Sequence, residues 1–185
     1  HRGPDALSFW NSNKVALGHN RLSIIDLSTS ANQPFYREDL GLTVVFNGEI
    51  YNYQSLRKYL KSKGCIFNTS SDTEVILVAY SHFGDSICKE LVGMFAFVIY
   101  DHNTEGVFAA RDRFGEKPFF YIQTSDSFFF ASELSALKKL YPKELTINQL
   151  AVVDLMENLY INLHHTIYNE IQVFPPSVQF LIRDR

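Results

Sequence analysis

The sequence predicts an α+β fold in which helices cover antiparallel sheets. Its 185 residues are 46% hydrophobic, which suits one good-sized buried core. The second half contains four continuous apolar runs of the kind found in strands buried on both faces, over residues 94–100, 106–110, 119–122 and 128–131. Segments with helical patterns flank these runs. A four-layer αββα sandwich, with helices outside two sheets, is therefore the simplest arrangement.

The first half predicts a hairpin, a short strand and two helices. In order, these are a hairpin over residues 6–10 and 14–22, a strand over 42–46, and helices over 53–63 and 72–83. Asn52 is the expected cap of the first helix. Ser71 and Glu74 have the spacing of a capping box before the second helix, in which each side chain satisfies the other's backbone N–H. Gly64 and Gly84 mark the two helix ends.

The last third is less regular. A helix is predicted over 134–140, a boundary at Tyr141-Pro142, a further helical stretch after Thr146 and a final strand over 178–182. His1 is not a translation start, so the sequence reads as part of a longer polypeptide, truncated at both ends.

Composition excludes several classes of protein. The 17 basic and 20 acidic residues give a net charge of −3, which argues against a nucleic-acid-binding surface. No apolar run approaches the roughly 18 residues that a membrane-spanning helix needs. The two cysteines are too few for a disulfide scaffold, so a cytoplasmic location is expected. The six histidines lack metal-ligand spacing, and no glycine-rich loop for ATP is present, so we expect no metal or cofactor in this chain.

Asn47-Gly48 follows an apolar strand and allows two interpretations. A glycine N–H beside an asparagine side chain makes a two-donor pocket for a developing oxyanion. The same dipeptide is also a common tight turn, which it favours when taken by itself.

Arg21 and Asp72 are candidates for binding opposite charges. Arg21 ends an apolar strand, where a buried guanidinium needs a partner: either a ligand carboxylate or one of the protein's own acids. Asp72 stands at a helix start, where an acid also stabilises the helix dipole without any ligand. If Arg21 held a carboxylate and Asp72 an ammonium group, the pair would fit an α-amino acid.

Taken together, the motifs resemble the class II glutamine amidotransferase domain of asparagine synthase. Six motifs match in order, at residues 1–5, 18–26, 47–52, 71–75, 91–97 and 110–118, and shorter matches follow at 131–133 and 166–168. The motif at 18–26, with Arg21 through Asp26, is of the asparagine-synthase type. The resemblance implies an N-terminal-nucleophile hydrolase fold over residues 1–140, with 141–185 as linker and start of a synthetase region.

The resemblance also implies roles for individual residues. Arg21 would hold the glutamine α-carboxylate, with the backbone of Leu22, Ser23, Ile24 and Ile25 shaping the pocket. Asn47 and Gly48 would form the oxyanion hole. Glu49 and Asp72 would bind the polar end of the substrate, Asp72 at its α-amino group.

The family's nucleophile is the thiol of an N-terminal cysteine, and this sequence has no cysteine at the matching position. Cys65 and Cys88 fit structural roles better than nucleophilic ones. We therefore expect no catalytic residue in this chain and no glutamine hydrolysis by it alone. The implied partners are glutamine, the synthetase domain of the parent, which would use ATP and Mg²⁺, and a second copy in a homodimer. The alternatives are a non-catalytic glutamine-binding or scaffolding module, and an amidotransferase with another acceptor, such as one in polysaccharide biosynthesis.

Overall fold

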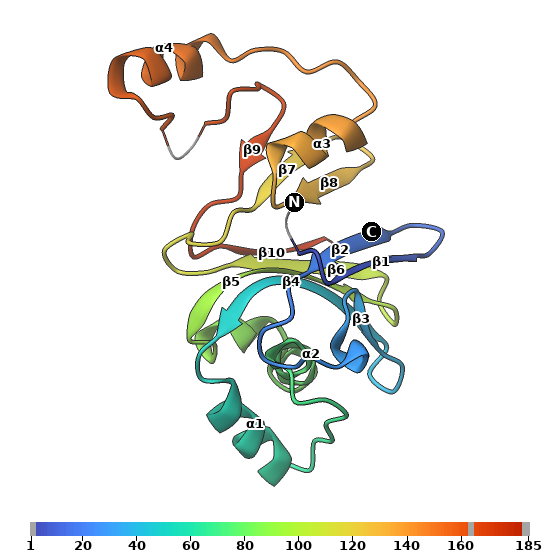
Figure 1. The fold of residues 1–185 in the computed structure, drawn as a ribbon. Coiled ribbons are helices and arrows are strands. Elements are labelled where there is room, and N and C mark those ends of the chain that lie inside the picture. The colour runs from blue at the N-terminus through green and yellow to red at the C-terminus, as the bar shows by residue number, and fades with distance from the viewer. Residues whose placement is uncertain (1–2, 163–164, 183–185) are drawn as a thin grey trace. The chain divides into compact units, whose positions relative to one another are not determined.

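The computed structural model describes residues 3–162 and 165–182, and it is a mixed α/β structure with antiparallel sheets (Figure 1). The His1-Arg2 start of the first motif and His164 lie outside the described residues. The described chain forms two compact units: residues 3–110 with Gln179–Ile182, and Arg111–Val178. The predicted α+β class with antiparallel sheets is confirmed. These compact units do not test the predicted domain boundary between residues 140 and 141, which stays a prediction.

The first unit contains a five-stranded antiparallel sheet and a separate hairpin. The hairpin strands are β1 (Ala6–Asn11) and β2 (Ala16–Arg21). The sheet has the order β10-β6-β5-β4-β3, with bounds Gln179–Ile182, Gly106–Arg111, Gly93–Asp101, Leu42–Ile50 and Phe35–Arg37. The central strands β4 and β5 pair along their full length. The apolar runs at 94–100 and 106–110 thus form buried strands, as predicted.

Two α-helices pack beside this sheet. They are α1 (Tyr53–Ser62) and α2 (Asp72–Phe83), followed by the 3₁₀ turn η2 (Gly84–Lys89), while the 3₁₀ turn η1 (Thr29–Ala31) precedes β3. Figure 1 shows α2 against the sheet and α1 outside it. Because α2 lies between the sheet and α1, every residue from Asp72 to Tyr80 is buried.

The second unit has a smaller sheet of the order β8-β7-β9. Its strands are β7 (Phe120–Gln123), β8 (Phe128–Ala131) and β9 (Gln172–Val173), and its helices are α3 (Leu134–Leu140) and α4 (Gln149–Asn158). Its small core contains Ile122, Leu137 and Ile171. Here too the predicted strands and the helix at 134–140 are present.

The motif at residues 110–118 folds upon itself. The buried Asp112 carboxylate accepts the backbone N–H groups of Phe114, Glu116 and Lys117 at 2.9–3.0 Å. The Arg111 guanidinium donates to the Lys117 and Gly115 carbonyls, both at 2.7 Å. These contacts satisfy the backbone polar groups of a tight loop, so Arg111 and Asp112 stabilise the conformation of this motif.

Two predicted helix caps differ from the structure. Asn52 makes no capping bond: its side chain donates to the Glu90 carbonyl and accepts the Val92 N–H, and so fastens a separate loop. The capping box is half right. Ser71 Oγ accepts the Glu74 N–H, but the Glu74 carboxylate turns instead to the loop before Ser71. The loop provides two backbone N–H groups to Glu74, whereas a capping box would provide only the N–H of Ser71. The capping pattern in the sequence does not reveal these loop donors.

Candidate functional site

Arg21 is the last residue of β2 and is only 7% exposed. Its Nη1 donates to the Ser28 carbonyl and to Asn32 Oδ1, both at 2.7 Å, and its Nη2 donates to the Asp26 carbonyl. These acceptors carry no formal charge. Within the described residues, Arg21 therefore does not form the structural salt bridge that the sequence left open.

The guanidinium of Arg21 keeps donors for a further acceptor. Arginine has five N–H donors, and three are used by these contacts. Among the described residues, the Nε–H and one Nη2–H of Arg21 have no protein acceptor. A carboxylate is the acceptor that best matches the fixed geometry and charge of such donors.

Asp72 opens α2 and is 6% exposed. Its Oδ2 accepts the Ile50 N–H at 3.1 Å, which ties the start of the helix to the end of β4. Burial raises the pKa of Asp72, and the negative charge of Glu49 acts in the same direction. Two carboxyl groups within electrostatic range, one of them buried, favour a bound cation between them.

Asn47 and Gly48 lie inside β4, opposite Ala96 and Phe95 of β5. The turn interpretation of this dipeptide is therefore wrong, because the strand continues to Ile50. Gly48 has φ +155°, and a Cβ there would stand 2.1 Å from the Met94 carbonyl oxygen. Only glycine allows the two strands to come this close. The sequence could not reveal the contact, since Met94 is distant in the chain.

The expected pocket segment, Leu22 to Ile25, follows β2 as an irregular loop. Leu22 and Ile24 are 59% and 71% exposed, while Ser23 and Ile25 are half-buried. The Ser23 N–H donates to Asp5 Oδ2 at 2.8 Å. The backbone of this segment is thus held by a carboxylate, and the side chains of Leu22 and Ile24 face solvent.

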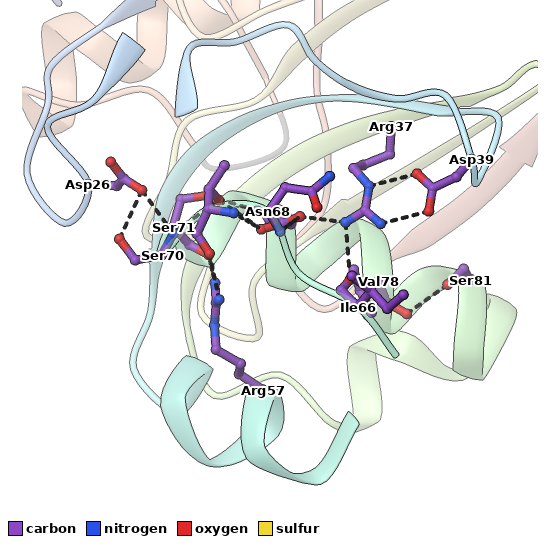
Figure 2. A network of polar contacts seen from close by, with 12 residues as sticks. Asp26, Arg37, Asp39, Arg57, Ile66, Asn68, Ser70, Ser71, Val78 and Ser81 are labelled. Carbon is purple, nitrogen blue, oxygen red and sulfur yellow. Dashed lines mark hydrogen bonds and ion pairs between the residues drawn. The ribbon is translucent and has the colours of Figure 1, made fainter. Parts of the chain in front are cut away.

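Asp26 links the Arg21 and Asp72 segments, and Figure 2 shows its contact with Ser70. Its Oδ2 accepts both the N–H and the hydroxyl of Ser70 at 2.9 Å, two residues before Asp72. Its own carbonyl accepts from Arg21. Asp26 had no predicted role, although its position two residues before Ser28 is typical of a local turn, in which Oδ1 accepts the Ser28 N–H. Its contact with Ser70, 44 residues away, has no sequence signal.

Gln33 and His19 are two further residues without a predicted role. Buried Gln33 accepts the Phe46 N–H at 2.6 Å and donates to Thr73 Oγ1 at 3.3 Å, so it bridges β4 and α2. His19 Nε2 donates to the Phe46 carbonyl at 3.1 Å, since a carbonyl can only accept. Burial lowers the pKa of His19, and the neighbouring Arg21 charge adds to this effect. The main chain just before Asn47 is therefore fixed by two side chains.

The two cysteines and the possible metal ligands were compared over the described residues. Burial raises the pKa of the Cys88 thiol to about 12, which keeps it protonated and unreactive near neutral pH. Cys65 is half-buried. Over residues 3–162 and 165–182, no group of three or more His, Cys, Asp or Glu side chains could hold a metal ion. In the same part of the chain, no helix has both the length and the apolar surface needed to cross a bilayer.

Comparison with known sequences supports the resemblance. A sequence profile described as a glutamine amidotransferase domain matches residues 1–185. The chain is 39% identical over 183 residues to asparagine synthetase (glutamine-hydrolyzing) 1 of Bacillus subtilis (strain 168), covering 99% of this chain and 29% of that protein. It is 44% identical over 138 residues to amidase chry2 of Gibberella zeae, covering 74% of this chain and 20% of that protein. The chain thus spans less than a third of these relatives.

Two solved structures have a similar fold. The glutamine phosphoribosylpyrophosphate amidotransferase from Bacillus subtilis, complexed with ADP and GMP, matches with a TM-score of 0.56 and 30% identity, over 66% of this chain and 28% of that one. A structure described as the allosteric regulatory enzyme of purine biosynthesis matches with a TM-score of 0.61 and 23% identity, over 91% of this chain and 33% of that one. These matches confirm the N-terminal-nucleophile type of fold. The chain belongs to the glutamine amidotransferase domain family.

Proposed function

We propose that this chain is the glutamine-binding domain of an asparagine synthase, in which hydrolysis of glutamine supplies ammonia for the ATP-dependent amidation of aspartate. The similarity to an asparagine synthetase over nearly the whole chain supports this proposal. The chain spans only 29% of that relative, so amidation would belong to a synthetase domain outside this sequence. Glutamine and that synthetase domain are the proposed partners, and a homodimer stays a prediction.

One observation supports the proposed binding mode: Arg21 and Asp72 lie in the same compact unit, and hydrogen bonds of Asp26 connect their segments. Arg21 donates to the Asp26 carbonyl, and the Asp26 carboxylate holds Ser70, two residues before Asp72. We assign the unused donors of Arg21 to the glutamine α-carboxylate. Asp72, assisted by Glu49, takes the α-ammonium group, whose positive charge offsets the cost of ionising a buried carboxyl.

The side-chain amide of glutamine would lie toward Asn47 and Gly48. When a thiol attacks the amide carbon, negative charge develops on the amide oxygen, and N–H donors held in a fixed strand stabilise it. Gln33 and His19 hold the preceding Phe46 backbone and so limit its movement. The backbone of Leu22, Ser23, Ile24 and Ile25 would close the side of the pocket next to Arg21.

The remaining chemistry is assigned to parts of the parent protein outside this sequence. The thiol would come from the N-terminal cysteine of the family, for which the buried Cys88 is no substitute. ATP and Mg²⁺ would activate the acceptor in the synthetase domain.

Calorimetric titration of the chain with L-glutamine tests the binding role. L-Glutamate is the matched control, because it differs only at the side-chain amide that Asn47 and Gly48 are proposed to receive. We expect L-glutamine to bind more tightly than L-glutamate. Absence of saturable L-glutamine binding would overturn the proposed function.

A second candidate function differs only in the acceptor. A relative at 44% identity is described as an amidase and not as an asparagine synthetase, so an amidotransferase with another acceptor is the second candidate. The longer protein, incubated with L-glutamine, ATP and aspartate, distinguishes the two. Asparagine as product supports the first candidate, while glutamine-derived ammonia without asparagine supports the second. Glutamine binding without any ammonia release would indicate a non-catalytic binding module.

A further inference from the structure

Two loops frame the proposed pocket, and they are held in different ways. The Arg21 loop, residues 22–34, connects β2 to β3. The Ser70 loop, residues 63–71, connects α1 to α2. Among the described residues, the hydrogen bonds that join the two loops are the two from Ser70 to Asp26 Oδ2.

The Ser70 loop is anchored to the helices on either side of it. Glu74, fully buried at 0% exposure, accepts the Asn68 and Thr69 N–H groups at 2.8 and 2.7 Å and is paired with Arg37. Arg57 of α1 donates to the Thr69 and Ser71 carbonyls at 2.5 and 2.9 Å, as Figure 2 shows. This loop therefore forms a rigid support for Asp72.

The Arg21 loop has a weaker hold of its own. In its first part, the side chains of Leu22, Ile24 and Leu27 are 59%, 71% and 76% exposed, so apolar packing does little to fix that part, although Ala31 further along is buried. Hydrogen bonds shape it instead, since Arg21 donates to two of its carbonyls and Asp26 accepts from Ser28 and Ser70. Gln33 holds the end of this loop to α2 and β4, so the position of the part around residues 22–28 relative to the Ser70 loop depends on Asp26.

The charge of Asp26 strengthens this contact. Its carboxylate accepts four hydrogen bonds, two from Ser28 and two from Ser70. These bonds, with that from the Ser28 hydroxyl foremost, hold the pKa of Asp26 well below its usual range. Bonds to an ionised carboxylate are stronger than bonds between neutral groups.

We propose that Asp26 is a positioning residue that sets the distance between Arg21 and Asp72, and so makes the domain selective for ligands carrying a carboxylate and an ammonium group on the same carbon. This inference rests on the proposed function. A ligand bound through both its carboxylate and its ammonium group is sensitive to small changes in the distance between Arg21 and Asp72. A ligand that has only one of these groups can follow the residue that binds it.

The test compares Asp26→Asn with the unsubstituted chain. The matched control is Asp126→Asn, because Asp126 accepts from Thr124 in an exposed turn of the second unit. NMR titrations use L-glutamine, glutaramate (which lacks the amino group) and 4-aminobutanamide (which lacks the carboxylate). We expect Asp26→Asn to weaken L-glutamine binding about tenfold and to change binding of the one-ended ligands less than about threefold. The control variant should match the unsubstituted chain.

Hydrogen exchange of the ligand-free protein provides an independent readout. Asp26→Asn should accelerate exchange in the Arg21 loop and at Ser70, while α2 stays protected. Ser70→Ala removes one of the two donors and should give a smaller change in the same direction. It serves as the second variant if Asp26→Asn does not fold.

Either of two results would overturn the inference. An equal loss for all three ligands would show that Asp26 only supports the fold, and unchanged exchange would show that it does not join the loops. Failure of the proposed function is distinguishable, since it would appear as absent L-glutamine binding in the unsubstituted chain.

Discussion

Arg21 and Asp72, the two charged residues of the proposed pocket, are held in place by different kinds of structure. Arg21 lies at the end of a hairpin strand, and its guanidinium is held by carbonyl and amide oxygens of an exposed loop. Asp72 lies at the start of a helix whose residues are buried from Asp72 to Tyr80. Both side chains are largely removed from water, at 7% and 6% exposed, but the cation is surrounded by oxygen acceptors of one loop, while the anion lies at the start of a buried helix.

This difference has consequences for ligand binding. Carbonyl oxygens orient the fork of Arg21, so the residue is prepared for a carboxylate. Burial disfavours the charged form of Asp72, so this residue gains most when a cation arrives. We therefore expect substitutions at the two ends to differ in their effects on affinity, stability and pH dependence.

The largest effect is expected from Arg21→Lys, which removes the Arg21 end. A lysine ammonium cannot bridge the Asp26 and Ser28 carbonyls and also present a two-donor edge to a ligand. L-Glutamine affinity should fall by about 100-fold, as expected when hydrogen bonds to a charged group are lost. Calorimetry measures this change. An affinity within about threefold of that of the unsubstituted chain would remove Arg21 from the carboxylate site.

A smaller loss, about tenfold, is expected from Asp72→Asn, together with a gain in stability. The amide oxygen can still accept the Ile50 N–H, but the negative charge that faces the ammonium group is absent. Because the pKa of Asp72 is raised in the folded state, that state binds a proton more readily than the unfolded state, and the Asp72 contribution to stability falls as pH rises. At pH 7 the variant should therefore have the higher Tm.

Thermal unfolding at several pH values tests this expectation. The difference in Tm should shrink as pH falls through the folded-state pKa of Asp72 toward the ordinary value near 3.9. A variant that binds L-glutamine normally, or is less stable at pH 7, would contradict the assignment of a buried ionised carboxyl to this end.

The smallest effect is the pH dependence of binding in the unsubstituted chain. L-Glutamine affinity should be constant near neutrality and weaken as pH falls through the raised pKa of Asp72, above the range of an ordinary aspartate. Asp26, with its lowered pKa, stays ionised in this window. Asp72→Asn should remove the pH dependence. If the dependence persists in this variant, another group titrates in the pocket.

Sequence reasoning succeeded where local pattern controls structure. The hairpin, α1, α2, α3 and most strands of the two sheets follow from hydrophobic periodicity, turn residues and glycine stops, which act over a few residues. The short strands β3 and β9 were not predicted. The ordered motifs also predicted the family. Arg21 and Asp72 stood out because a charged residue beside an apolar strand or at a helix start is chemically conspicuous.

It was wrong, or made no assignment, where contacts join distant segments. Asn47-Gly48 looks like a turn because the dipeptide favours one, but pairing with β5 extends the strand through it. Glu74 was expected to complete a cap, yet it binds the preceding loop and Arg37. Asp26 and Gln33 had no assigned role, since their partners Ser70 and Thr73 lie 44 and 40 residues away.

The sequence by itself therefore determined which elements form, which family the chain belongs to, and which residue types are available to bind an amino acid. Only the tertiary structure decided which of them are joined: it linked Arg21 to Asp72 through Asp26 and Ser70, and set Gly48 against Met94. The physical reason is range. Backbone preferences and periodicity act over a few residues, whereas burial and hydrogen-bond partners depend on which segments the folded chain brings together.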